Sequence, residues 1–276
     1  IRARHRDGVV LVKVVVKPYS MKLEKYRKKI IRMLWKRNYI REEADRTLEE
    51  RKALADVPNA LGYQRIIETE TNGFLVRQYL YSSLYDRMST RPFLEDIEKK
   101  WLAFQLLCAL RDCHSRDIFH GDIKTENILV TSWNWLYLSD FSSSFKPTNL
   151  PEDNPADFSY FFDNAGRRTC YLAPERFLAA GEEPASKTKV TCAMDMFSVG
   201  CVIAELFLES PTFNLSQLYK YKKGEYDPTI SHLDRIADKD IRDLVSHMIQ
   251  LDPERRYSAE DYLNFWRKKV FPEYFY

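Results

Sequence analysis

Residues 120–127 read His120-Gly121-Asp122-Ile123-Lys124-Thr125-Glu126-Asn127, and after a short hydrophobic stretch the chain continues with Asp140-Phe141-Ser142. This set of side chains suits phosphoryl transfer. Asp122 can accept the proton of an attacking hydroxyl group, and Lys124 can neutralise charge on the moving phosphoryl group. Asn127 and Asp140 can hold Mg²⁺ on the phosphates of a nucleotide. An ordered spacing over about twenty residues is far more specific than a single motif.

Two hydrophobic segments, 128–130 and 136–138, flank Trp133-Asn134-Trp135 and predict a hairpin. Such a hairpin would carry Asn127 and Asp140 to the same cleft. The two tryptophans suit packing or contact with a partner better than nucleotide binding.

The composition narrows the function classes. The chain has 276 residues, with 43 basic and 40 acidic side chains and a net charge of +3, so nucleic acid is not an expected partner. The length suits one two-lobed domain or two small ones. The five cysteines form no C-x-x-C pair, which indicates reduced thiols in a cytosolic protein. The longest apolar run falls well short of the ~20 residues that a membrane span needs, so we expect a soluble protein.

The order of these motifs resembles the eukaryotic protein kinases. The resemblance implies an α+β fold with two lobes: residues 1–80 as a partial amino-terminal lobe ending at the hinge, and residues 81–276 as a helical lobe with an activation segment at 140–175. Strands are expected at 1–6 and 9–17, joined at Asp7-Gly8. The first strand and the glycine-rich phosphate lid of such a fold would lie upstream of Ile1.

Several residues match the nucleotide-binding positions of that family. Lys13 matches the lysine that pairs with the α- and β-phosphates. Its carboxylate partner is expected at Glu50, with Glu49 as the alternative, at the end of a strongly helical segment spanning 21–54. The basic side chains of this segment suit a solvated helix face, or contact with an anionic membrane surface.

Residues 74–80 are expected to form a strand that leads into the hinge, where backbone groups near Gln78 and Leu80 would bind the base. Ser82 and Ser83 should cap the short helix that follows. Arg77 falls behind the base, where a guanidinium can donate to the carbonyl oxygen of guanine but not to the amino group of adenine. The resemblance therefore implies Mg²⁺ with ATP or GTP, and Arg77 favours the guanine nucleotide. Alternatively, Arg77 turns away to pair with Glu50 and leaves ordinary ATP binding.

The carboxyl-terminal part contains further kinase-like features. An amphipathic helix is expected at 96–114 and a buried anchoring helix at 195–200. Glu175 should form a buried ion pair with Arg256. Three departures bear on activity: Gly121 replaces the usual arginine, Ser142 replaces glycine, and Arg168 stands where a threonine normally bridges the catalytic Asp and Lys. Four aromatic residues within 158–162 suit either an exposed protein contact or packing on the own lobe.

The aromatic activation segment, residues 120–127 and Thr131-Ser132-Trp133-Asn134-Trp135 are together similar to one subfamily, the kinase-like domains of the vacuolar-protein-sorting fifteen regulatory subunits of class III phosphatidylinositol 3-kinase. The resemblance implies partners in the lipid-kinase catalytic subunit and adaptor subunits. It also implies a cytoplasmic protein held peripherally on endosomal and autophagic membranes by a lipidated amino terminus outside this chain, with further domains beyond Tyr276. Two functions stay open: an active serine/threonine kinase, and a nucleotide-binding pseudokinase that acts by protein contact.

Overall fold

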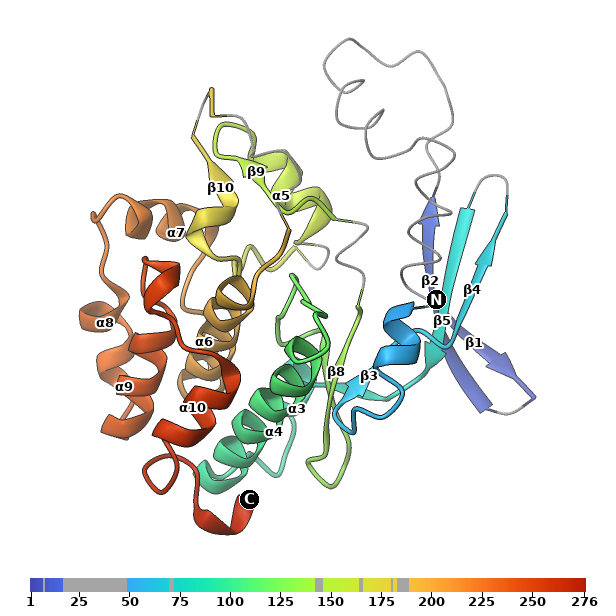
Figure 1. Cartoon of the computed structure of the whole chain (residues 1–276), viewed down its shortest axis with the longest axis horizontal. Coiled ribbons are helices and arrows are strands. Elements are labelled where there is room, and N and C mark those ends of the chain that lie inside the picture. The colour runs from blue at the N-terminus through green and yellow to red at the C-terminus, as the bar shows by residue number, and fades with distance from the viewer. Residues whose placement is uncertain are drawn as a thin grey trace.

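The computed structural model describes residues 1–6, 8–16, 49–69, 72–141, 146–163, 166–179, 181–182 and 189–276. A strand-rich amino-terminal part adjoins a larger, mainly helical part (Figure 1). This is the predicted α+β organisation with two lobes. The boundary at residue 80 stays a prediction.

The amino-terminal sheet has four described strands in the order β1-β2-β5-β4, all antiparallel: β1 (Arg2–His5), β2 (Gly8–Val16), β4 (Arg65–Glu68) and β5 (Asn72–Gln78). β2 is rich in valine, which favours extended backbone. His5 pairs with Gly8, so Gly8 begins β2 and is not part of the turn that was predicted at Asp7-Gly8. Gly8 has a φ of 134°, which favours glycine there, and Asp7 lies outside the described residues.

Of the helix predicted at 21–54, only the end falls within the described residues, and residues 49–53 are helical there. Leu54 and Val57, directly after this helix, are buried in the main hydrophobic core. The basic stretch before residue 49 lies outside the described part of the chain.

A second sheet lies where the two parts of the molecule meet, with strand order β3-β8-β7-β6: β3 (Ala60–Leu61), β6 (Ser82–Ser83), β7 (Ile128–Val130) and β8 (Leu136–Ser139). β7 and β8 form the predicted antiparallel hairpin, and β8 packs on the long helix α4. Ser83 caps the short helix α3 (Leu84–Met88) with its hydroxyl group, also as predicted. The hairpin thereby fixes residues 127 and 140 at its two open ends.

The helical part is built around α4 (Asp96–His114) and α6 (Cys192–Leu208), which contact each other in the core (Figure 1). Further helices surround them: α5 (Pro155–Phe161), α7 (Leu215–Lys222), α8 (Pro228–Ser231), α9 (Lys239–Met248) and α10 (Ala259–Phe265). Short 3-10 turns lie at η2 (Pro174–Arg176), η3 (Leu233–Arg235), η4 (Pro253–Arg255) and η5 (Glu273–Phe275), and a parallel pair joins β9 (Leu150–Pro151) to β10 (Phe177–Leu178).

α6 is apolar on nearly all sides, as expected of a helix enclosed by others. At Gly200, a Cβ atom would lie 2.7 Å from the Cβ of Met248 on α9, so glycine permits the close approach of the two helices. Among the helices that the structure describes, none combines the length and apolar character needed to cross a membrane.

Candidate active site

The loop at 120–127 lies between α4 and β7, and hydrogen bonds to α6 hold it in place. The Asp195 carboxylate accepts hydrogen bonds from the backbone N–H groups of His120 and Gly121, each at 2.8 Å. The Asp195 side chain also bonds to His114 at 3.0 Å. Burial opposes its ionisation, yet these partners lower its pKa. The predicted anchoring role of the 195–200 helix is confirmed.

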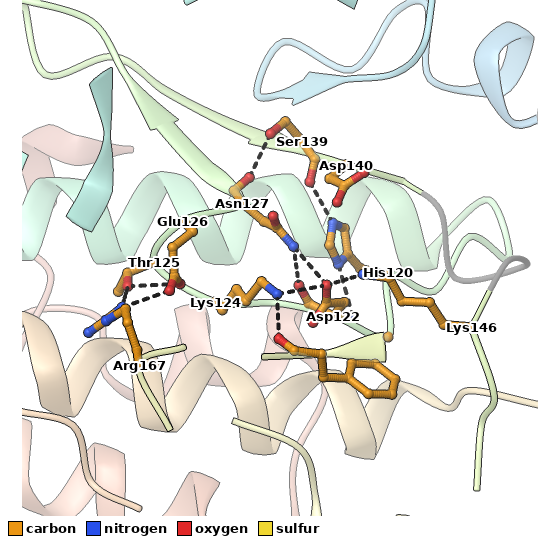
Figure 2. A network of polar contacts seen from close by, with 12 residues as sticks. His120, Asp122, Lys124, Thr125, Glu126, Asn127, Ser139, Asp140, Lys146 and Arg167 are labelled. Carbon is orange, nitrogen blue, oxygen red and sulfur yellow. Dashed lines mark hydrogen bonds and ion pairs between the residues drawn. The ribbon is translucent and has the colours of Figure 1, made fainter. Parts of the chain in front are cut away.

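Asp122 lies inside this loop and is buried. Its Oδ2 atom accepts a hydrogen bond from Asn127 Nδ2 at 3.0 Å and forms ion pairs with Lys146 and with Lys124, the latter at 3.3 Å (Figure 2). Lys124 also donates to the backbone carbonyl of Phe162 at 2.8 Å. Burial opposes ionisation, but the two lysines outweigh it and lower the pKa of Asp122. The Asp122 carboxylate is therefore charged, and three donor groups contact its Oδ2 atom.

Asp140 begins the segment after β8 and has a φ of 67°, an uncommon backbone conformation for a residue with a side chain. Lys13 donates to both carboxylate oxygens, at 2.7 and 2.9 Å, and the Tyr63 hydroxyl group donates to Oδ1. Burial opposes the charge of Asp140, but Lys13 and Lys146 hold its pKa well below the usual range. Lys13 thus joins the amino-terminal sheet to the segment after β8.

Asn127 and Asp140 line one cavity of about 130 Å³, to which Lys124 also contributes. The structure thus brings together the two side chains proposed as metal ligands. Carboxylate and amide oxygens are the donors that Mg²⁺ prefers. Since Asn127 uses its Nδ2 for Asp122, its Oδ1 is the atom that suits a cation. These residues fit a magnesium ion, and their roles stay predictions.

Arg77, on β5, is only 7% exposed. Its Nη1 donates to the Gln78 carbonyl at 3.0 Å, and its buried Nε finds no acceptor in the part of the chain that the structure describes. Burial lowers its pKa, while Tyr63 and Asp140 oppose that effect. This Nε is thus an unused donor in the interior of the described part of the protein. The base-binding roles of Gln78 and Leu80 stay predictions.

Glu50 is half-buried and Glu49 exposed, in the helical residues 49–53. The predicted pairing of Glu50 with Lys13, and its alternative pairing with Arg77, stay predictions.

An arginine-centred network lies beside the loop and was not predicted. Arg167 Nη1 donates to Glu126 at 2.9 Å and to Thr125 at 3.1 Å, and Nη2 donates to Glu205 of α6 at 2.7 Å (Figure 2 shows the first two). The guanidinium carbon lies 3.9 Å from the centre of the Tyr85 ring. The network ties the end of the activation segment to the loop and to the core helix. Arg168, expected at the position of a bridging threonine, instead uses its backbone N–H to bond Asp163 at 3.1 Å.

The aromatic residues of the activation segment correct one expectation. Phe158 and Phe162 are buried in the main core and Phe161 packs against it, so only Tyr160, at 73% exposure, faces solvent. The exposed-contact interpretation is wrong for the three phenylalanines, because the α5 helix turns them towards the lobe. The structure confirms the alternative, in which the phenylalanines pack on their own lobe.

The ion pair predicted between the end of the segment and the lobe is present. Arg256 donates to both Glu175 oxygens, at 2.7 and 3.1 Å, and its side chain is fully buried. Ser142, the departure from glycine after Phe141, lies outside the described residues.

A profile of the protein kinase domain matches residues 15–266. The chain belongs to the protein kinase family. The catalytic roles of Asp122 and Lys124, metal binding by Asn127 and Asp140, and phosphate binding by Lys13 agree with the family's motifs and stay predictions.

Several of the similar proteins are VPS15 serine/threonine-protein kinases. The chain is 50% identical to serine/threonine-protein kinase VPS15 of Arabidopsis thaliana over its whole length, and 53% identical to that of Saccharomyces cerevisiae over 81% of its length. It is 56% identical over 79% of its length to a probable serine/threonine-protein kinase vps15 of Dictyostelium discoideum. It spans 18%, 16% and 11% of these proteins, respectively.

The sequence reasoning missed four residues of this site: Tyr63, Lys146, Arg167 and Glu205. Glu205 carried a signal, because a carboxylate that interrupts an apolar run of a buried helix needs a cation. Lys146 and Tyr63 carried none. Each reaches the site through a contact between segments far apart in the chain.

Proposed function

We propose that this protein kinase domain binds a nucleotide with Mg²⁺ and serves mainly as a nucleotide-dependent regulatory domain. The observation that supports it is the cavity lined by Asn127 and Asp140, with Lys13 bonded to Asp140 at 2.7 Å. Membership of the protein kinase family implies ATP and Mg²⁺ as general ligands. Asn127 and Asp140 would hold the metal ion, which would neutralise negative charge on the phosphates.

Phosphoryl transfer is proposed to be weak or absent. A general base must be free to accept a proton from the substrate hydroxyl group. Asp122 has a lowered pKa, and its Oδ2 is shared by two ammonium groups and an amide. The second candidate is an active serine/threonine kinase, which is supported by the similarity to serine/threonine-protein kinases and by the presence of Asp122 and Lys124.

The base preference is proposed to be GTP or GDP over ATP. The buried Nε of Arg77 has no acceptor among the described residues, and an amino group on adenine would meet such a donor with another donor. The carbonyl oxygen of guanine would accept a charge-assisted bond contributing roughly 1.5 to 3 kcal/mol.

We further propose a role in the class III phosphatidylinositol 3-kinase complex, with the catalytic and adaptor subunits as partners, at endosomal and autophagic membranes. This rests on the similarity to VPS15 kinases alone. A lipidated amino terminus outside this chain would supply the membrane attachment.

Two experiments test the function. Thermal unfolding with Mg²⁺ and a purine nucleotide at a hundredfold excess over its dissociation constant should show a stabilisation of about 2.7 kcal/mol. No shift with any purine nucleotide would refute nucleotide binding. Competition of GTP against ATP tests the base preference, and equal or tighter ATP binding refutes it. Arg77→Met should erase any preference.

Transfer of radiolabelled phosphate, compared between the wild type and Asp122→Ala, separates the two candidates. Robust transfer that Asp122→Ala abolishes would establish the active kinase and refute the regulatory interpretation.

A further inference from the structure

Three cationic side chains are gathered around Asp122. Lys124 and Lys146 both contact its Oδ2 atom, and in the described part of the chain neither lysine is within ion-pair distance of another carboxylate. A third buried cation, Arg176, donates to the carbonyl oxygens of Gly121, Thr148 and Pro147. Three cations therefore gather around Asp122, and the charges of Asp140 and Asp195 also act on members of this cluster.

The cations are close enough to affect one another. Lys146 Nζ lies 5.5 Å from the centre of the Phe162 ring, and the guanidinium carbon of Arg176 lies 5.0 Å from it. Burial and the charge of Arg176 lower the pKa of Lys146, but Asp122 and Asp140 outweigh them and raise it. Lys146 is thus a buried, charged ammonium group that the carboxylates of Asp122 and Asp140 stabilise.

A buried ammonium or guanidinium group needs an anionic or carbonyl partner. The three cations differ in how they are held. Arg176 is fixed by three carbonyl groups, and Lys124 is fixed by the Phe162 carbonyl at 2.8 Å. Lys146 has Asp122 as its one polar partner among the described residues, and Asp122 would keep Lys124 and Asn127 if Lys146 left. Lys146 is therefore the cation that can be transferred to an incoming anion.

We propose that Lys146 is a ligand of the terminal phosphate of the bound nucleotide and makes the site selective for triphosphates over diphosphates. The proposal rests on the nucleotide site proposed above. Lys13, at the other end of the cluster, bonds Asp140 and matches the lysine of the α- and β-phosphates, so a chain of three phosphates has a cation at each end.

The test is the ratio of the dissociation constants of GDP and GTP, and of ADP and ATP, measured by calorimetric titration of the purified protein with Mg²⁺. Lys146→Met should reduce the preference for the triphosphate by roughly 10- to 100-fold, the value of one charge-assisted hydrogen bond, and change diphosphate binding little. Lys146→Arg should keep most of the preference. Lys239→Met, an exposed lysine at the start of α9, is the matched control and should keep all of it. Circular dichroism and thermal unfolding confirm that each variant is folded.

The outcomes separate this proposal from the nucleotide site itself. An unchanged ratio in Lys146→Met overturns the assignment. An equal decrease in the dissociation constants of both nucleotides also overturns it, because Lys146 would then only hold Asp122 in place. Inorganic tripolyphosphate serves as a probe without a base. If it binds in a Lys146-dependent manner while no nucleotide binds, the assignment holds and the nucleotide function fails. If neither binds the wild type, both are overturned.

Discussion

Replacement of Arg167 by methionine should destabilise the protein, because it leaves the Glu205 carboxylate in the interior without a cation. Arg167 Nη2 lies 2.7 Å from Glu205 Oε1, and the Glu205 side chain is 2% exposed. Its other hydrogen bond comes from the Tyr171 hydroxyl group. Methionine keeps much of the volume of the arginine and could still cover the Tyr85 ring. The change therefore isolates the charge.

The expected loss follows from these contacts. Removing one partner of a buried ion pair costs about 3 to 5 kcal/mol. The second pair, with the more exposed Glu126, adds at most about 1 kcal/mol. Glu205 can escape part of the cost by binding a proton, because burial already raises its pKa. We expect the free energy of unfolding at pH 7 to fall by about 2 to 4 kcal/mol, measured by urea denaturation.

Two controls sharpen this prediction. Arg168→Met, an exposed arginine one position further on, should change stability by less than about 0.5 kcal/mol. In Arg167→Met, the folded state holds a proton on Glu205 at a pH where the unfolded carboxyl group has released it, so the loss should shrink as the pH falls from 8 towards about 5. A loss below about 1 kcal/mol at pH 7, or one that is the same at both pH values, would refute the reasoning.

Glu175→Gln should lower the free energy of unfolding by about 3 kcal/mol, because Arg256 is fully buried, and an unchanged urea midpoint would contradict this. Burial lowers the pKa of His114, but its bond to Asp195 prevails and raises the pKa to about 9. The stabilisation by protonated His114 is therefore complete below its unfolded pKa of 6.5 and disappears as the pH rises through about 9. His114→Asn should flatten the dependence of the unfolding free energy on pH over that range, and an unaltered dependence would contradict this prediction. Gly200→Ala should cost about 1 to 3 kcal/mol, because its Cβ would lie 2.7 Å from an α9 side-chain atom, and wild-type thermal stability would disprove the close packing.

Local patterns predicted much of the fold. The spacing of apolar residues predicts α4 with its observed bounds, Asp96–His114, and the sequence also predicts the helix cap at Ser83. These features depend on residues close in the chain. Gly8 was wrongly placed in the turn of the first hairpin, because the pairing of His5 with Gly8 depends on the register of two strands.

The site was predictable where the family motifs are continuous and unpredictable where distant segments meet. Residues 120–127 and Asp140 were found from spacing alone. The contact of Lys146 with Asp122 and that of Arg167 with Glu205 join residues 24 and 38 positions apart. The choice between burial and exposure of Phe158 and Phe162 was left open for a similar reason, since aromatic content alone does not tell which face a short helix presents to its own lobe.

The most direct test of the proposed function is calorimetric titration of the purified protein with GTP, with Mg²⁺ and with a chelator in its place, for the wild type and for Asp140→Asn. Asparagine keeps the size of the side chain but removes the charge that Lys13 and a metal ion would share. We expect saturable binding by the wild type that weakens without Mg²⁺, and at least tenfold weaker binding by Asp140→Asn, the loss of a charge-assisted contact. No binding by the wild type, or equal binding by both proteins, would contradict a nucleotide site built on Asn127 and Asp140.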